Sequence, residues 1–243
     1  LPVYNALKFI QPTVESVLLQ SHQEWELIII DDCSPDGTYE YIKSKYSSDP
    51  RIVFAQNDVN SGAGITRNLG LKLATGSLIA FIDADDIWLE NKLEKQLNYM
   101  EKLNSAIVHT SYSFINEEGN KIPGKVSVSE IVDLRSYMRN TEIGMSTSLI
   151  NKDIVGEFSF NPMRTRQDTR LWLDLLSLGF VANGLDEVLV NYRVREGQIS
   201  GNKFVIAYRT FKVYFAVKNI PIKERLINYC FYAVNGVLKR FKK

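Results

Sequence analysis

Cysteine and histidine are scarce in this chain, with two of each among 243 residues. Cys33 and Cys230 lie far apart in unlike contexts, so a disulfide framework is not expected, and a reducing compartment, by default the cytoplasm, fits better. We interpret His22 and His109 as structural or surface residues. The search for chemistry therefore turns to the carboxylates and arginines.

Long apolar runs and a strong net charge are also absent. No run of 18 apolar residues, signal peptide or transit peptide is present, so the chain as given is expected neither to export itself nor to span a bilayer. The net charge of +1 provides no global field toward nucleic acid, and we expect no nucleic-acid partner. An initiator Met is missing too. Because Leu1-Pro2-Val3-Tyr4 reads like the end of a strand, we expect a few N-terminal residues to precede it.

The charge is unevenly distributed along the chain. Residues 202–243 carry ten Lys or Arg and one acid, Glu224, for a local net charge of +9, which leaves −8 on the remainder. We therefore expect a main domain over 1–200 and a basic tail over 201–243.

The first 86 residues alternate between short apolar segments and segments of helical spacing. Strands are predicted over 26–30, 51–55 and 77–82, and helices over 7–20, 38–46 and 63–74. Such alternation predicts an α/β fold with a mostly parallel sheet flanked by helices on both faces. Ligands bind to such sheets at the carboxyl ends of the strands. Asp31-Asp32 and the segment 83–86 both follow strands, so we expect them at one edge.

Beyond Glu90 the pattern loosens. Further helices are predicted over 90–102 and 169–178, and further strands over 106–114, 144–150 and 188–193. The helix over 169–178 ends before Gly179, which is typical of a C-terminal cap. One face of this helix carries Leu171, Trp172, Leu175 and Leu176.

Asp83, Asp85 and Asp86 place three carboxylates within four residues, directly after an apolar strand. Like charges so close repel each other, and a bound divalent cation is the simplest way to offset them. Hard oxygen ligands favour magnesium, manganese or calcium, but Ile87 and Trp88 stand where an EF-hand calcium loop needs an oxygen ligand and a glycine. The alternative is a solvated turn that caps a helix starting near Ile87.

Two further segments fit a nucleotide. A carboxylate at a strand end, such as Asp32, can accept from the N3 proton and ribose hydroxyls of a nucleotide, although it can also close an Asx-turn. The segment 61–68 lacks the third glycine of a dinucleotide fingerprint, because Arg67 stands there. Glycines ahead of a helix with an arginine in its first turns can still hold a diphosphate, the alternative being a plain loop into a helix.

Five short motifs stand in order along the first 86 residues. They are Pro2-Val3-Tyr4-Asn5, Ile30-Asp31-Asp32-Cys33-Ser34 with Asp36-Gly37-Thr38, Asn60-Ser61-Gly62 leading to Arg67-Asn68 and Gly70, Ala74-Thr75-Gly76, and Phe81-Ile82-Asp83-Ala84-Asp85-Asp86. Weaker motifs follow at Gln167-Asp168-Thr169-Arg170-Leu171-Trp172-Leu173 and Tyr192-Arg193-Val194-Arg195. Together they resemble family-2 glycosyltransferases of the GT-A fold, of the bacterial surface-polysaccharide type. The resemblance covers about residues 1–200 and implies a nucleotide-binding half over about 1–100 and an acceptor half over about 101–200.

The resemblance implies a donor site for a uridine diphosphate sugar. It assigns nucleotide binding to Pro2, Tyr4, Asp32, Arg67, Asp83 and Asp85. It further implies that Asp85 or Asp86 ligates Mn²⁺ or Mg²⁺. The metal would act as a Lewis acid on the leaving diphosphate.

Asp168 is the general base that the resemblance implies. It would take the proton from an acceptor hydroxyl as that oxygen attacks the anomeric carbon, so that displacement is direct and the configuration inverts. The alternative is that Asp168 is the N-cap of the helix that follows it.

The chain departs from the family pattern at two positions. Gln167 stands where many relatives have a first acid, which leaves the base itself in place. Arg195 stands where the family often has a histidine, and a guanidinium cannot ligate a metal. Arg195 can instead pair directly with diphosphate, so we expect a weaker metal dependence than usual.

The basic tail is predicted as two helices over 203–219 and 222–241, separated at Pro221. The first carries an aromatic stripe of Phe204, Tyr208, Phe211 and Phe215, and the chain ends in a basic run over 239–243. Such helices suit an anionic membrane surface, where each Lys or Arg contributes about 1 kcal/mol. The alternative is that the apolar stripes pack on the domain or on a second copy in a homodimer.

We therefore expect a metal-dependent, inverting glycosyltransferase. It would move a sugar from a UDP-sugar to a saccharide or lipid-linked saccharide in surface polysaccharide or glycolipid synthesis, in the cytoplasm or peripherally at the inner face of the membrane. A sugar-nucleotide nucleotidyltransferase is the enzyme alternative, although Asn5-Ala6-Leu7-Lys8 lacks its glycine-rich signature. A non-catalytic nucleotide-binding module is the other alternative.

Overall fold

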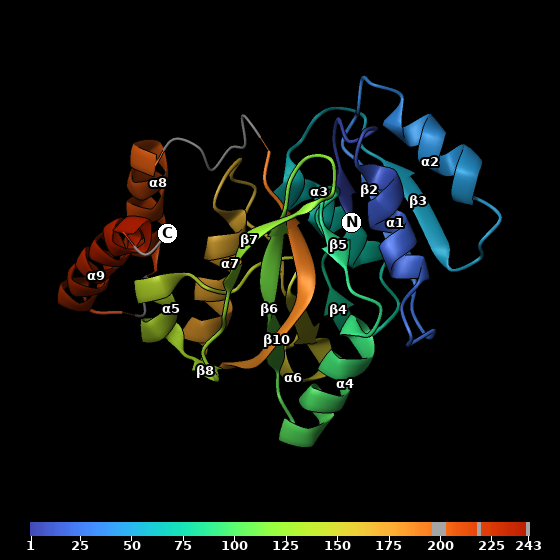
Figure 1. Ribbon diagram of the computed structural model, residues 1–243. Helices are drawn as coiled ribbons and strands as arrows, with labels where there is room; N and C mark the ends of the chain where they lie inside the picture. The colour runs from blue at the N-terminus through green and yellow to red at the C-terminus, as the bar shows by residue number, and fades with distance from the viewer. Residues whose placement is uncertain (196–202, 218–219, 242–243) are drawn as a thin grey trace.

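The computed structural model describes residues 1–195, 203–217 and 220–241 (Figure 1). Its strands form two sheets with helices packed around them. The first sheet is parallel and has the order β1-β2-β3. Its strands are β1 (Pro2–Val3), β2 (Leu27–Asp31) and β3 (Ile52–Gln56), and the helices that follow them are α1 (Ile10–Leu18), α2 (Thr38–Tyr46) and α3 (Ala63–Leu73). The predicted alternation of strands and helices is confirmed in this part.

In the described part of the chain, the second sheet has seven strands. Its only parallel pair is β6 with β10, and its other pairs are antiparallel. Its main path is β4 (Leu78–Ala80), β9 (Ser148–Asn151), β6 (Ile107–Ile115), β10 (Ala182–Arg193) and β5 (Ile87–Trp88), with β7 (Lys121–Val126) on β6 and β8 (Ile131–Val132) on β10. The α/β class is confirmed, but the expectation of a mostly parallel sheet is wrong here. The turn between β6 and β7 is too short for the crossover that a parallel pair requires.

Four helices pack on the second half of the chain: α4 (Lys92–Leu103), α5 (Leu134–Asn140), α6 (Lys152–Val155) and α7 (Gln167–Ser177). The predicted apolar face of α7 is buried in the larger core, and Trp172 is fully buried there. Gly179 follows the helix with φ 94°, a left-handed conformation that favours glycine and confirms the predicted cap. α5 was not predicted; the Asp133 carboxylate accepts from the Ser136 amide at 2.7 Å and caps it.

The tail forms α8 (Lys203–Ala216) and α9 (Ile222–Phe241), close to the predicted bounds. At one end of the molecule α9 lies against α5, α8 lies against α7, and the two tail helices contact each other (Figure 1). Tyr214 is fully buried in the larger core, and its hydroxyl donates to the Met138 carbonyl at 2.6 Å. One face of the tail therefore packs on the domain, as the packing alternative states. The Phe204 side chain and the side chains of the terminal basic run lie outside the described residues.

Residue 200 as a domain boundary stays a prediction, because it falls in a part of the chain outside the described residues. The helices beyond it share the core formed by the helices and strands before it. Within the described ranges, every helix is too short or too polar to cross a bilayer.

Candidate active site

A cavity of about 810 Å³ gathers almost all of the predicted site residues. Those that line it are Pro2, Tyr4, Asp32, Arg67, Asp83, Asp85, Asp168 and Arg195. Pro2 lies in β1 and the half-exposed Tyr4 directly follows that strand. Asp86 is the one predicted residue that does not line the cavity. The carboxyl ends of β1 and β2 and the loop after β4 thus meet at one site, as the sheet topology led us to expect.

Asp32 organises the loop that leads into α3. Its carboxylate accepts from the backbone amides of Ser61 at 2.8 Å and Gly62 at 2.7 Å, and from the Asn57 side chain at 2.8 Å. The side chain is buried, yet it forms part of the cavity wall. Asp32 therefore fixes the shape of the loop, and any contact with a nucleotide base would use its remaining lone pairs.

Gly62 lies where this loop passes under an arginine. Its φ is 88°, and a Cβ at this position would lie 3.2 Å from the Arg164 side chain. The Arg164 guanidinium donates to the Asn60 carbonyl at 2.9 Å and also to the Asn60 side-chain oxygen. The positive φ thus favours glycine here, a Cβ would displace the Arg164 side chain slightly, and the loop is bound to the segment that precedes α7.

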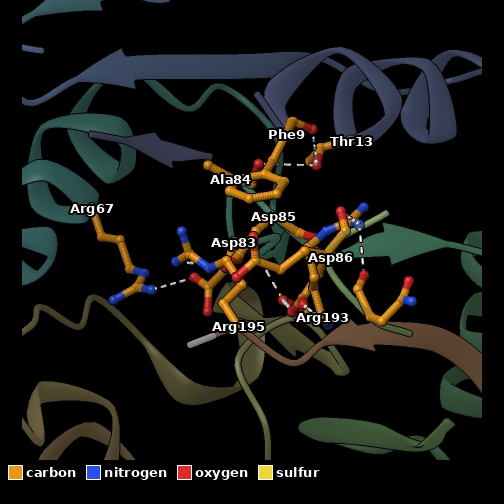
Figure 2. Close-up of polar contacts among 12 residues, drawn as sticks. Phe9, Thr13, Arg67, Asp83, Ala84, Asp85, Asp86, Arg193 and Arg195 are labelled. Atoms are coloured by element: carbon orange, nitrogen blue, oxygen red, sulfur yellow. Dashed lines mark hydrogen bonds and ion pairs between the residues drawn. The ribbon is translucent and has the colours of Figure 1, made fainter. Parts of the chain in front are cut away.

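Arg67 points from α3 toward the acidic loop after β4 (Figure 2). Its Nη2 atom donates to Asp83 Oδ1 at 2.5 Å, and the residue is only 7% exposed. Its Nε and Nη1 atoms have no hydrogen-bond partner in the described parts of the chain. A buried guanidinium with unused donors at a cavity wall is well suited to bind phosphate oxygens.

Asp85 forms the second carboxylate and arginine pair. Arg195 Nη2 lies 2.7 Å from Asp85 Oδ2, and its guanidinium also lies 5.1 Å from the centre of the Phe9 ring (Figure 2). Burial raises the pKa of Asp85, the Asp83 charge adds to this, and Arg195 partly opposes it. The negative charge is therefore only partly balanced, and a further cation would stabilise the ionised pair of carboxylates.

Asp86 faces the protein interior. It is 1% exposed, and its carboxylate accepts from the Ser146 hydroxyl at 2.5 Å and from the Arg193 amide at 3.0 Å. Burial, and next the charges of Asp83 and Asp85, raise its pKa well above the ordinary carboxyl range. This carboxylate connects the loop to β10, so the geometry favours Asp85 over Asp86 as a metal ligand.

The helix-cap alternative for the acidic cluster is wrong. The residues after Asp86 form β5, and the next helix, α4, begins at Lys92 with Asn91 at its N-cap. The carboxylates of the cluster are thus not used to cap a helix.

Asp168 lies in the first turn of α7 and lines the cavity. The N-cap position belongs to Arg166, and no side chain caps this helix, so the N-cap alternative for Asp168 is wrong. The closest hydrogen bond to its carboxylate comes from the Thr169 hydroxyl at a long 3.5 Å. Among the described residues, no Lys or Arg forms a salt bridge with it. The carboxylate is therefore available to accept a proton from a ligand.

The carboxylates fit a divalent metal that shares its ligands with a substrate. The described residues contain no group of three His, Cys, Asp or Glu that could hold a metal alone. Magnesium, however, is commonly held by one or two carboxylates together with substrate phosphates. Asp83 and Asp85 provide such a pair, with oxygen atoms of the preferred chemistry and a negative charge that Arg67 and Arg195 only partly balance.

Comparison with known proteins identifies the family. Residues 1–163 match the family model described as "Glycosyl transferase family 2". This chain belongs to that family. It is 39% identical over 239 residues to "Putative teichuronic acid biosynthesis glycosyltransferase TuaG" of Bacillus subtilis (strain 168), covering 98% of this chain and 95% of the relative. It is 36% identical over 239 residues to "UDP-Glc:alpha-D-GlcNAc-diphosphoundecaprenol beta-1,3-glucosyltransferase WfaP" of Escherichia coli, covering 97% and 92%.

The fold of this glycosyltransferase also resembles solved structures. "Crystal structure of S. aureus TarS 1-349 in complex with UDP-GlcNAc" superposes with a TM-score of 0.73 at 18% identity, covering 96% of this chain and 70% of that one. A mannosyltransferase of Pyrobaculum calidifontis in complex with GDP-Man and Mn²⁺ gives a TM-score of 0.70 at 15% identity, covering 95% and 67%. These likenesses confirm the expected fold.

Sequence reasoning missed four residues of the site: Ser146, Arg164, Arg166 and Arg209. Ser146 holds Asp86, and the three arginines line the cavity. Arg164 and Arg166 lie in a segment without a recognisable motif. The only available signal was two arginines placed one residue apart, shortly before the predicted base.

Proposed function

We propose that this glycosyltransferase moves a sugar from a UDP-sugar to a hydroxyl of a lipid-linked saccharide during surface polysaccharide synthesis. The observation that carries the proposal is the placement of Asp168, which lines the same cavity as the Arg67–Asp83 and Arg195–Asp85 pairs. The names of the TuaG and WfaP relatives support the polysaccharide and the lipid-linked acceptor.

The donor diphosphate would lie between the two carboxylate and arginine pairs. Arg67 has two unused donor atoms and Arg195 has one, its Nε, in the described residues. A leaving uridine diphosphate gains negative charge in the transition state, and fixed guanidinium groups in a partly buried site stabilise that charge without reorganising. Pro2 and Tyr4, at the end of β1, would hold the base beside the Asp32 loop.

Asp168 would act on the other substrate. Its carboxylate would accept the proton of the acceptor hydroxyl while that oxygen attacks the anomeric carbon from the face opposite the leaving diphosphate. Because bond formation and departure occur on opposite faces, the anomeric configuration inverts. No covalent sugar intermediate on the enzyme is needed.

We also propose that Mn²⁺ or Mg²⁺ assists the reaction, held by Asp85 with Asp83 nearby. When bound, the metal would supply Lewis-acid stabilisation of the leaving diphosphate. Arg195 already neutralises part of the Asp85 charge, so the residues here favour a moderate rather than an absolute dependence on metal.

The enzyme would work peripherally at the inner face of the membrane, where a lipid-linked acceptor resides. Helix α9 packs through its Asn228 side, whereas Leu226, Ile227, Phe231 and Val234 on other faces are about half exposed. An exposed apolar helix face next to a basic chain end suits an anionic lipid surface.

Asp168→Asn tests the proposed mechanism directly. We expect transfer to fall by about a hundredfold to ten-thousandfold, since general base catalysis contributes about 10²–10⁴, while the affinity for UDP measured by titration calorimetry stays within about twofold. Asp174→Asn is the matched control, because Asp174 lies on the same helix and pairs with Arg170 away from the cavity. Unchanged turnover in Asp168→Asn would remove Asp168 from the mechanism and favour another base.

A further inference from the structure

The arginines of the cavity differ in how their charge is balanced. On the donor side, Arg67 and Arg195 each form a salt bridge with an aspartate. Arg166 and Arg209 line the same cavity, and neither forms a salt bridge with an acidic residue in the described ranges. Arg164 also lines the cavity without a described acidic partner, but its guanidinium is bound to Asn60. Arg166 and Arg209 therefore remain as the two cations in the wall around Asp168 that no described carboxylate balances and that Asn60 does not hold.

Arg166 is held in an unusual backbone conformation. Its φ is 65°, in the left-handed region that non-glycine residues seldom adopt, at a cost of about 1–3 kcal/mol. Its guanidinium donates to the Tyr232 hydroxyl at 3.3 Å, and the Tyr232 and Thr210 hydroxyl oxygens lie 3.4 Å apart. The tail helices thus fix a strained arginine two residues before the proposed base.

Arg209 comes from the tail itself. Helix α8 contributes Ile206 and Arg209 to the cavity wall, and these lie three residues apart on one helix face. Val205 and Tyr208 lie on the neighbouring face, and Tyr208 is 58% exposed. A solvent-facing strip of Val205 and the Tyr208 ring therefore begins where the cationic wall of the cavity ends, with Lys212 Nζ 4.6 Å from the centre of that ring.

We propose that Arg166 and Arg209 bind the diphosphate of a polyisoprenyl diphosphate-linked acceptor, whose hydrocarbon chain leaves the cavity over Val205 and Tyr208. This inference rests on the proposed function and assigns the acceptor's anionic group to named residues. Guanidinium groups bind phosphate oxygens in paired hydrogen bonds, and the donor diphosphate already has its own arginines. The saccharide at the other end of the diphosphate would then reach Asp168.

Binding can be measured without knowing the acceptor sugar. Calorimetry would use the full chain saturated with UDP and Mn²⁺, so that the donor site is occupied, and would titrate farnesyl diphosphate against farnesol. We expect farnesyl diphosphate to bind and farnesol to bind at least about tenfold more weakly. Arg209→Gln and Arg166→Gln should each weaken farnesyl diphosphate about tenfold, as expected for a lost charge-assisted hydrogen bond, and should leave UDP affinity unchanged.

Arg170→Gln is the matched control, since Arg170 lies one turn further along α7, pairs with Asp174 and does not line the cavity. Absence of farnesyl diphosphate binding to the UDP-loaded protein would overturn the inference. Equal losses of UDP affinity in Arg166→Gln and Arg209→Gln would also overturn it, because the two arginines would then serve the donor. If the wild-type protein does not bind UDP in the presence of Mn²⁺, the proposed function itself is refuted.

The hydrocarbon path has its own test. Tyr208→Ser should weaken farnesyl diphosphate severalfold and leave inorganic pyrophosphate unchanged. If pyrophosphate binds the wild-type protein as tightly as farnesyl diphosphate, the path over α8 is wrong and a free diphosphate is the ligand of this wall.

Discussion

Asp86 has a structural role that the sequence alone does not distinguish from the substrate-facing role of Asp83 and Asp85. Asp83, Asp85 and Asp86 follow the same strand, yet the first two face the cavity and the third is bound by Ser146 and the β10 backbone. Three carboxylates within four residues cannot all point the same way, because the chain turns here. The residue that faces inward becomes a structural connection, and the other two remain for the substrate.

This difference predicts how two variants respond to metal. Asp85→Asn should reduce the strengthening of UDP binding by Mn²⁺ by at least about tenfold, because changing even a residue that only orients a metal ligand typically costs about 10–100-fold in metal affinity. Asp86→Asn should keep it, since an amide can still accept from the Arg193 amide and donate to the Ser146 hydroxyl. Calorimetric titration of UDP with and without Mn²⁺ measures both. A folded Asp86→Asn protein without a manganese effect would make Asp86 the ligand.

His109 predicts a pH dependence of stability. Its ring is fully buried in β6, neither nitrogen has a hydrogen-bond partner in the described residues, and burial lowers its pKa to about 4. The unfolded chain therefore takes up this proton first, and the free energy of unfolding falls as the pH drops from about 6.5 to about 4, by up to about 3 kcal/mol.

Urea unfolding at pH 7 and pH 4.5 checks this expectation. His109→Met should remove that part of the pH dependence, whereas His22→Gln should leave it, because His22 is partly exposed. An identical pH dependence in wild type and His109→Met would show that other groups cause it.

At the scale of elements, α9 has two faces that predict different partners. Asn228 accepts from the Arg139 guanidinium at 2.9 Å on the packed side. On the exposed side, Ile227→Ser combined with Phe231→Ser should lower binding to phosphatidylglycerol vesicles at least about tenfold, because each apolar side chain contributes about 1.5–3 kcal/mol when buried. Vesicle co-sedimentation is the measurement.

A double variant at exposed apolar residues outside the tail is the control. Leu19→Ser with Val59→Ser removes side chains that are 69% and 66% exposed and should leave vesicle binding unchanged. If the α9 variant instead splits a dimer in analytical ultracentrifugation and vesicle binding does not change, this face joins two copies of the chain.

For the whole molecule, the core extends across the expected boundary at residue 200. Four buried tail residues belong to the larger core: Val213, Tyr214, Val217 and Ile220. Deleting residues 203–243 should lower the free energy of unfolding by at least about 5 kcal/mol, a large part of the 5–15 kcal/mol typical of a domain. Urea unfolding measures it, with Arg135→Gln as a control that breaks only the exposed Glu224 pair. An unchanged urea midpoint would mean that the tail does not contribute to the stability of the domain.

The donor half of the site could be predicted from the sequence because its residues follow strands whose ends meet. Asp32 and Asp83 each come directly after or close behind an apolar run that predicts a strand. The fold then brings the ends of these strands together. Arg209 has no such signal, since its position depends on how α8 packs. The strands β5 and β7 were missed for the same reason: two residues, or a segment with Pro123 and Gly124, become strands only through pairing with β10 and β6.

The segment that precedes α7 is attached to the donor side at two points. Phe160 exchanges backbone hydrogen bonds of 2.7 and 2.8 Å with the Asn68 side chain, and Arg164 holds Asn60. Asp168 lies only four residues after Arg164. The number of residues between Phe160 and Asp168 therefore sets the reach from one substrate to the other. In related enzymes we expect the length of this segment to tolerate neither insertion nor deletion.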